Sequence, residues 1–155
     1  MLDKSNRRII EILQEDGRRS FTSIGRDLGM SEAAVRARVQ RMTDAGVLSV
    51  VAVTDPLRLG FEVMALIAVQ ATDLTRVADE VSEWAETSYV VIAAGAYDLL
   101  VEVVCEDNSD LLRVVERLRS VDGVRSTETF MYLSLRKMTY SWGTGANGDG
   151  PSQRQ

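Results

Sequence analysis

Residues 31–42 read SEAAVRARVQRM, and this stretch decides the fold of the N-terminal part of the chain. Ser31 is a residue type that commonly caps a helix, and Val35, Val39 and Met42 follow at the spacing of one helical face. Gly46 supplies a stop signal. At about 100° per residue, the side chains turned away from this face are small or polar: Ala33, Arg36, Ala37, Gln40 and Arg41, with Arg38 on the flank. The stretch predicts an amphipathic helix with a cationic outer face.

Two further helices are predicted before this one. Asp3 and Ser20 are suitable N-caps, and Gly17 and Gly29 are suitable stops. The apolar positions between them recur at helical spacing: Ile9, Ile10 and Leu13 in the first helix, and Phe21, Ile24 and Leu28 in the second. Gly25 lies four residues before Gly29, and its small size lets two helices cross closely. Three short helices in this order indicate a helix-turn-helix domain.

The charge of the chain is divided unevenly between its two parts. The whole sequence has a formal net charge of -5. Residues 1–54 nevertheless hold nine Lys/Arg against seven Asp/Glu, whereas residues 55–155 hold nine against sixteen. A basic N-terminal third with arginines on one helix favours contact with nucleic acid, although a solvated arginine-rich helix surface would look the same.

After residue 46 the periodicity changes to that of strands. We predict strands at 47–54, 62–71, 89–94, 99–105 and 124–135, and helices at 74–85 and 109–121. Ser109 is the expected cap of the second of these helices. From residue 62 the order is β-α-β-β-α-β, which is a ferredoxin-like α/β sandwich within an α+β chain. Because several of these strands are apolar at both parities, we expect the second face of the sheet to meet a partner subunit.

The composition lowers the expectation of catalysis. The chain has no histidine and a single cysteine, Cys105, so the common histidine-based nucleophile and metal sites are absent from the sequence. We interpret Cys105 as a buried small hydrophobe and expect no cofactor and no metal. The polar start of the sequence and the lack of a long apolar run favour a cytoplasmic protein without a membrane segment.

The sequence resembles the leucine-responsive regulatory protein/AsnC family of transcription factors over about residues 2–140. The resemblance depends on five stretches in the family's order: LDKSNRRIIEIL, GMSEAAVRARVQRMTDAGVL, DPLRLGF, GAYDLLVEVV and VDGVRSTETFMYLSLRK. It implies a winged helix-turn-helix domain followed by a ferredoxin-like domain of the RAM type. The expected division is 1–48 for DNA binding, 49–60 for a strand-containing linker, 61–140 for effector binding and oligomerisation, and 141–155 for a disordered tail.

Matching the family's motif places the DNA-binding residues on the third helix. Together with the helical wheel, it predicts contacts from Ser31, Ala33, Ala34, Arg36, Ala37, Arg38, Gln40 and Arg41. Arg38, on the flank, is expected to anchor a phosphate or the domain itself rather than read a base. Two residues depart from the family's pattern: Asn6 replaces an acidic residue and Gly25 replaces alanine, which predicts a soft second helix.

The resemblance also implies an amino-acid effector bound near the turn GAYD, residues 95–98. A carboxylate could take the ammonium group of an amino acid, and backbone N–H groups could take its carboxylate. The predicted contacts are Gly95, Tyr97, Asp98, Thr127, Glu128 and Thr129. The same turn is equally explained as a β-turn in which Tyr97 packs and Asp98 bonds to nearby backbone.

The sequence therefore predicts a DNA-binding transcriptional regulator that is modulated by a small amino acid or a related metabolite. Its expected partners are double-stranded DNA with a pseudo-palindromic operator and further copies of the chain, as a dimer, tetramer or octamer. Two alternatives stay open at this point. One is an architectural DNA-binding protein without an effector, and the other is a small ferredoxin-like enzyme with a helical appendage.

Overall fold

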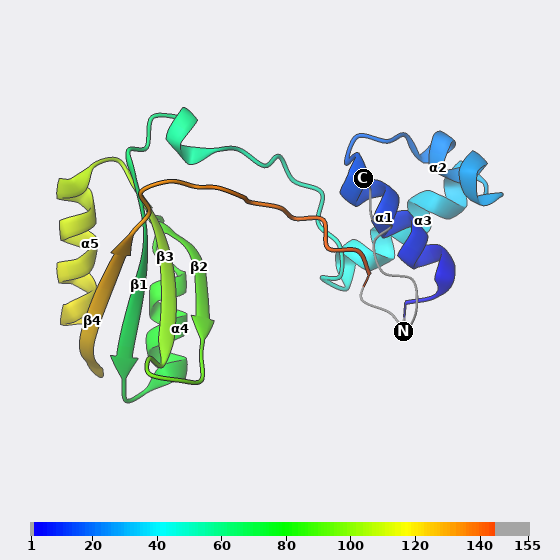
Figure 1. Ribbon diagram of the computed structural model, residues 1–155. Helices are drawn as coiled ribbons and strands as arrows, with labels where there is room; N and C mark the ends of the chain where they lie inside the picture. Colours follow the sequence, from blue (N-terminus) through cyan, green and yellow to red (C-terminus); the bar gives the residue numbers. More distant parts are fainter. Residues whose placement is uncertain (1, 145–155) are drawn as a thin grey trace. The chain divides into compact units, whose positions relative to one another are not determined.

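The computed structural model describes residues 2–144 of the chain. Contacts within it divide the chain into two units (Figure 1). Among the described residues, the first unit contains those up to Val53 and those from Lys137 onward, and the second contains Thr54–Arg136. The predicted boundaries at residues 48, 60 and 140 lie near these divisions but remain a prediction.

The first unit is built from three helices whose starts follow the caps expected from the sequence. They are α1 (Lys4–Glu15), α2 (Phe21–Leu28) and α3 (Glu32–Asp44). The side chains of Asp3, Ser20 and Ser31 each accept a hydrogen bond from the backbone N–H three residues on. One apolar cluster joins the helices: Ile9, Ile10, Ile12, Leu13, Ile24, Val35, Val39 and Met42 are all buried. The arrangement is a helix-turn-helix domain, as predicted.

The second unit is a four-stranded antiparallel sheet with two helices. After a short 3₁₀ helix, η1 (Pro56–Arg58), its elements follow the predicted β-α-β-β-α-β order (Figure 1). They are β1 (Val63–Ala71), α4 (Leu74–Ser82), β2 (Thr87–Ile92), β3 (Leu99–Cys105), α5 (Asn108–Ser120) and β4 (Val124–Met131). The strand order β2-β3-β1-β4 is that of a ferredoxin-like fold.

The core of the second unit lies between the sheet and the two helices. Alternate residues of the central strands, such as Ile67 of β1 and Val101 of β3, are buried against Val81 of α4 and Leu118 of α5. The intervening residues form what we call the open face of the sheet, which neither helix covers. It includes Leu66, Ala68, Tyr89, Leu100, Glu102, Glu128 and Phe130.

The predicted strand at 47–54 is wrong for the single chain. These residues form no strand in the structure, and Val47, Val50, Val51 and Val53 are exposed. The run is rich in β-branched residues, but a strand exists only where a neighbouring strand completes its backbone hydrogen bonds. The family resemblance implies a winged helix-turn-helix, and this stretch, which follows the third helix, forms no wing strand here.

Two smaller expectations also need correction. Helix α5 is capped by Asp107, whose carboxylate accepts the Asp110 N–H at 2.8 Å, and not by Ser109. The helix begins one residue earlier than predicted, because aspartate and serine are both good caps and the sequence alone did not separate them. The predicted disordered tail begins with described residues 141–144, of which Gly143 and Thr144 bond to α1; residues 145–155 lie outside the described residues.

Candidate DNA-binding and effector sites

Helix α3 presents one face to the core and the opposite face to solvent. Val35, Val39 and Met42 are buried. The residues predicted to face outward are all exposed, namely Ala33, Arg36, Ala37, Gln40 and Arg41. A shallow hollow of about 570 Å³ lies on this face, lined by Glu32, Ala33, Arg36, Ala37 and Gln40. Small side chains between polar ones leave room for base edges to approach the helix.

Glu32 also belongs to this face, although it is not among the contacts predicted from the sequence. Its carboxylate accepts hydrogen bonds from Arg36 Nη2 at 2.6 Å and from Thr22 Oγ1 at 2.7 Å. The Thr22 hydroxyl first, and then the Arg36 guanidinium, lower the pKa of Glu32 from its ordinary value. The Arg36 guanidinium also lies over the Phe21 ring, 5.2 Å from its centre. Arg36 is therefore held and partly neutralised. The i,i+4 spacing of Glu32 and Arg36 was the signal that could have revealed this pair.

The other polar residues of this face are held less firmly. Gln40 donates to the Asp44 carboxylate at 2.7 Å, and Arg41 Nε donates to the Ala37 carbonyl at 3.3 Å. Within residues 2–144, no carboxylate forms an ion pair with Arg41. Its positive charge is thus available for a phosphate.

Arg38 anchors the domain itself. Its Nη1 donates to the Asp3 carboxylate at 2.6 Å and to the Asn6 side-chain oxygen at 2.8 Å, and its side chain is only 25% exposed. The Asn6 backbone N–H first, and then Arg38, lower the pKa of Asp3. Arg38 therefore ties α3 to α1. Ser31 caps α3 by accepting the N–H of half-buried Ala34 at 3.2 Å.

Gly25 allows α2 to approach the turn that leads into α3. A Cβ atom at this position would lie 2.5 Å from the Met30 carbonyl oxygen. The same turn is closed by the Met30 N–H, which donates to the Gly25 carbonyl at 2.8 Å. Close packing against the turn therefore explains why glycine stands at position 25. The sequence alone had predicted only that this glycine lowers the stability of α2.

The turn at 95–98 is tied to neighbouring strands by its own polar groups. The Asp98 carboxylate accepts the Ala71 N–H at 2.9 Å, and the Asp98 N–H donates to the Val69 carbonyl at 2.9 Å. The Tyr97 hydroxyl donates to the Glu128 carboxylate. These bonds agree with the expectation that Asp98 bonds to backbone, here that of β1, and one of its carboxylate oxygens is already engaged. The role of Gly95, Tyr97 and Asp98 in effector binding stays a prediction.

The structure does not bring all the predicted effector residues together. Glu128 pairs with Ala68 and lies on the open face. Thr127 and Thr129 pair with Val69 and Ile67, so they lie on the face that the helices cover. Thr127 Oγ1 accepts a hydrogen bond from Arg119 of α5 at 2.9 Å. A single ligand on the open face would reach Glu128 and not the two threonine side chains.

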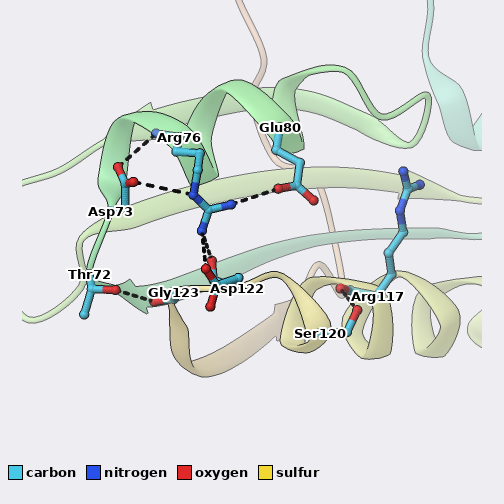
Figure 2. A network of polar contacts seen from close by, with 8 residues as sticks. All are labelled: Thr72, Asp73, Arg76, Glu80, Arg117, Ser120, Asp122 and Gly123. Carbon is cyan, nitrogen blue, oxygen red and sulfur yellow. Dashed lines mark hydrogen bonds and ion pairs between the residues drawn. The ribbon is translucent and has the colours of Figure 1, made fainter.

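Figure 2 shows a polar network around Arg76 that was not predicted from the sequence. Arg76 of α4 lies within 3.5 Å of Asp73, 3.3 Å of Glu80 and 3.4 Å of Asp122. The Thr72 hydroxyl donates to the Gly123 carbonyl at 3.3 Å beside it. The network joins the start of α4 to the turn between α5 and β4. One arginine contacts three carboxylates of the same unit, and these contacts hold α4 to the turn between α5 and β4.

Neither a metal site nor a membrane-spanning helix is found in the part of the chain that the structure describes. Residues 2–144 contain no cluster of three or more metal-ligating side chains. No helix among them is long and apolar enough to cross a membrane.

Comparison with known proteins gives matches along nearly the whole chain. Residues 2–43 match the AsnC-type helix-turn-helix domain, and residues 62–142 match the Lrp/AsnC ligand binding domain. An HTH-type transcriptional regulator of Pyrococcus horikoshii is 36% identical over 144 residues, which cover 90% of this chain and 91% of the relative. The regulator FL11 of Pyrococcus furiosus is 31% identical, with 90% and 94% covered.

Solved structures agree with the fold. The Escherichia coli AsnC structure has a TM-score of 0.77 at 23% identity, covering 90% of this chain and 97% of that one. Mycobacterium tuberculosis LrpA, a leucine response regulatory protein, has a TM-score of 0.81 at 23% identity, covering 88% and 96%. A transcriptional regulator of Neisseria meningitidis, solved as a complex with L-Met, has a TM-score of 0.77 at 26% identity, covering 91% and 96%.

Proposed function

Because the chain belongs to the Lrp/AsnC family of transcriptional regulators, we propose that it recognises operator DNA through the outward face of α3 and responds to a small amino acid. The family match makes the chain a DNA-binding transcriptional regulator and not an enzyme, so the alternative of a ferredoxin-like enzyme is wrong. Its site of action is proposed to be the cytoplasm, where bacterial and archaeal DNA lies.

The observation that carries the DNA proposal is the composition of the exposed face of α3. Ala33 and Ala37 keep the centre of the face small, so that Gln40 can approach base edges in the major groove. Arg41 has no ion-pair partner in the described residues and would bind a phosphate. Arg36 would have to break its ion pair with Glu32 before it could contact DNA. Arg38, Ser31 and Ala34 would stabilise α3 through contacts within the domain.

Assembly through the open face is the second part of the proposal. Two apolar residues of this face, Tyr89 and Phe130, are 57% and 46% exposed. Packing a second copy against this surface would bury them and present two α3 helices to the half-sites of a pseudo-palindromic operator. A dimer is the unit this requires, and tetramers or octamers would be built from such dimers.

The effector is proposed to bind beside the turn at 95–98, where Tyr97 meets Glu128 at the open face. The related Neisseria regulator binds L-Met, which supports an amino acid as the ligand class. If the open face is also the interface between copies, a ligand here would act on assembly and on DNA binding together. An architectural protein without an effector would show the DNA binding alone.

Two measurements test the proposal. Selection of double-stranded DNA from a random library should return a recurring, two-fold symmetric sequence. Calorimetric titration with the twenty common amino acids, with assembly size followed by light scattering, should then identify a ligand that shifts operator affinity. Selection that returns no recurring sequence contradicts specific recognition. If the protein selects a specific DNA sequence but binds none of the twenty amino acids, the result supports the architectural alternative.

A further inference from the structure

The C-terminal segment contacts α1 at one point. Residues 132–142 are exposed throughout, whereas Gly143 and Thr144 are half-buried. Four hydrogen bonds join these two residues to α1, at distances between 2.7 and 3.2 Å. An exposed stretch of chain therefore ends in two residues that are hydrogen-bonded to α1. We call these two residues, Gly143 and Thr144, the anchor.

The first half of the anchor is a reciprocal pair of bonds with Gln14. The Gln14 side-chain Nε2 donates to the Gly143 carbonyl at 3.2 Å, and the Gly143 N–H donates to Gln14 Oε1 at 3.1 Å. Gly143 has a φ of 74°, a conformation that residues with a Cβ atom disfavour. A glutamine amide and a glycine backbone can therefore form a two-point contact here.

The second half of the anchor holds Thr144. Arg7 Nη1 donates to the Thr144 carbonyl at 2.7 Å, and the Thr144 hydroxyl donates to the Glu11 carboxylate at 3.1 Å. Arg7, Glu11 and Gln14 are spaced i, i+4 and i+7, so they form one stripe along α1. All three are half-buried.

The anchor changes how the two units are connected. The chain leaves the first unit after Val53 and returns to it at Lys137 (Figure 1). We propose that Gly143 and Thr144 dock on the stripe Arg7–Glu11–Gln14 as a second tether, so that the DNA-binding unit is held by two passages of chain instead of one. A unit held at two points has less rotational freedom than one held by a single linker.

The tether would act on the recognition helix through α1. Asn6 of α1 and the N-cap residue of α1, Asp3, hold Arg38 of α3. Restricting α1 therefore restricts α3. This consequence rests on the proposed function: in an assembly with two recognition helices, tethered units engage half-sites only at a limited set of spacings.

The experiment compares operator spacings in the wild type and four variants. Two truncations of the full chain differ in the anchor: one stops after Ala146 and keeps it, and the other stops after Tyr140 and removes it. Gln14→Leu breaks the reciprocal bonds in the full-length chain, and Lys4→Gln, on the exposed side of α1, is its control. Each protein binds a two-half-site DNA in phase and one with about 5 bp, half a helical turn, inserted.

The measured quantity is the affinity for the in-phase DNA divided by the affinity for the DNA with the insertion. We expect the Ala146 truncation and Lys4→Gln to keep the wild-type ratio, because any change in overall charge affects both DNAs equally. The Tyr140 truncation and Gln14→Leu should lower this ratio at least about twofold, the lower end of the range for losing a net hydrogen bond. An unchanged ratio in the Tyr140 truncation overturns the proposal, and so does a wild type without spacing preference.

A second readout separates this proposal from the proposed function. Exchange of the Gly143 amide hydrogen, followed by NMR on the full chain without DNA, should be faster in Gln14→Leu than in Lys4→Gln by roughly 2- to 12-fold. A protein that binds no DNA contradicts the proposed function, yet the amide readout still decides the docking. Equal exchange rates in the two variants contradict the anchor whether or not DNA is bound.

Discussion

The three arginines of α3 differ in what holds them, and the difference assigns them different roles. Arg38 is tied to Asp3 at 2.6 Å. Arg36 is tied to Glu32 at the same distance, on the exposed face. Arg41 donates only to the carbonyl of its own helix among the described contacts. Sequence periodicity separated the flank position from the outer face, but it could not show which outer arginine has a partner.

Glu32 should weaken DNA binding. Its carboxylate lies on the face proposed to meet DNA and pairs with Arg36. Glu32→Gln removes the negative charge and releases Arg36, so affinity for the selected operator should rise roughly 2- to 5-fold at low salt, as for an exposed ion pair. Fluorescence anisotropy measures this, with Glu116→Gln of α5 as the charge-matched control. Weaker binding by Glu32→Gln would show instead that the carboxylate contacts a base.

Cys105 should be unreactive while the protein is folded. Burial first, and then the nearby carboxylates of Asp110 and Glu86, raise the pKa of its thiol to about 11. The thiolate is disfavoured, so at pH 8 the thiol stays protonated as well as inaccessible. A disulfide reagent that releases a coloured thiolate should react only after urea is added. Reaction of the native protein at the rate of a free thiol would contradict this placement.

At the scale of elements, the α2–α3 turn depends on the absence of a Cβ atom at Gly25. Gly25→Ala gains helix propensity of about 1 kcal/mol. It also places a Cβ atom 2.5 Å from the Met30 carbonyl, and overpacking of this kind costs about 1–3 kcal/mol. The free energy of unfolding should therefore fall or stay level rather than rise.

Urea denaturation measures this change, and Gly17→Ala is the matched control, since a Cβ atom there would lie at an ordinary 3.7 Å from Val50. A clear gain in stability from Gly25→Ala, larger than any gain from Gly17→Ala, would mean that the close approach is not a constraint.

The helices were predictable because their signals are local, whereas parts of the sheet and the site were not. Asp3, Ser20 and Ser31 cap helices by reaching three residues along the chain. The run at 47–54 has strand-forming residues, but strand formation depends on a pairing partner that local sequence does not specify. The separation of Glu128 from Thr127 follows from strand register, which fixes the face of every residue and is set by pairing at a distance.

At the scale of the whole molecule, the open face of the sheet is proposed to hold copies of the chain together. Phe130 is 46% exposed there, opposite Leu66. Phe130→Asp would place a charge in the interface, where its desolvation is unfavourable, and should shift the assembly to smaller species. Sedimentation velocity measures the size, and Leu112→Asp, on α5 at 57% exposure, is the control. Dissociation by Leu112→Asp alone would place the interface on the helices.

The central claim is that the outward face of α3 binds DNA, and the salt dependence of operator binding for Arg41→Ala tests it most directly. Losing one phosphate contact should weaken binding and make the slope of log affinity against log salt shallower by about one unit. Assembly size should not change, and Arg113→Ala of α5 should keep the wild-type slope. An Arg41→Ala protein with wild-type affinity and slope would contradict the account.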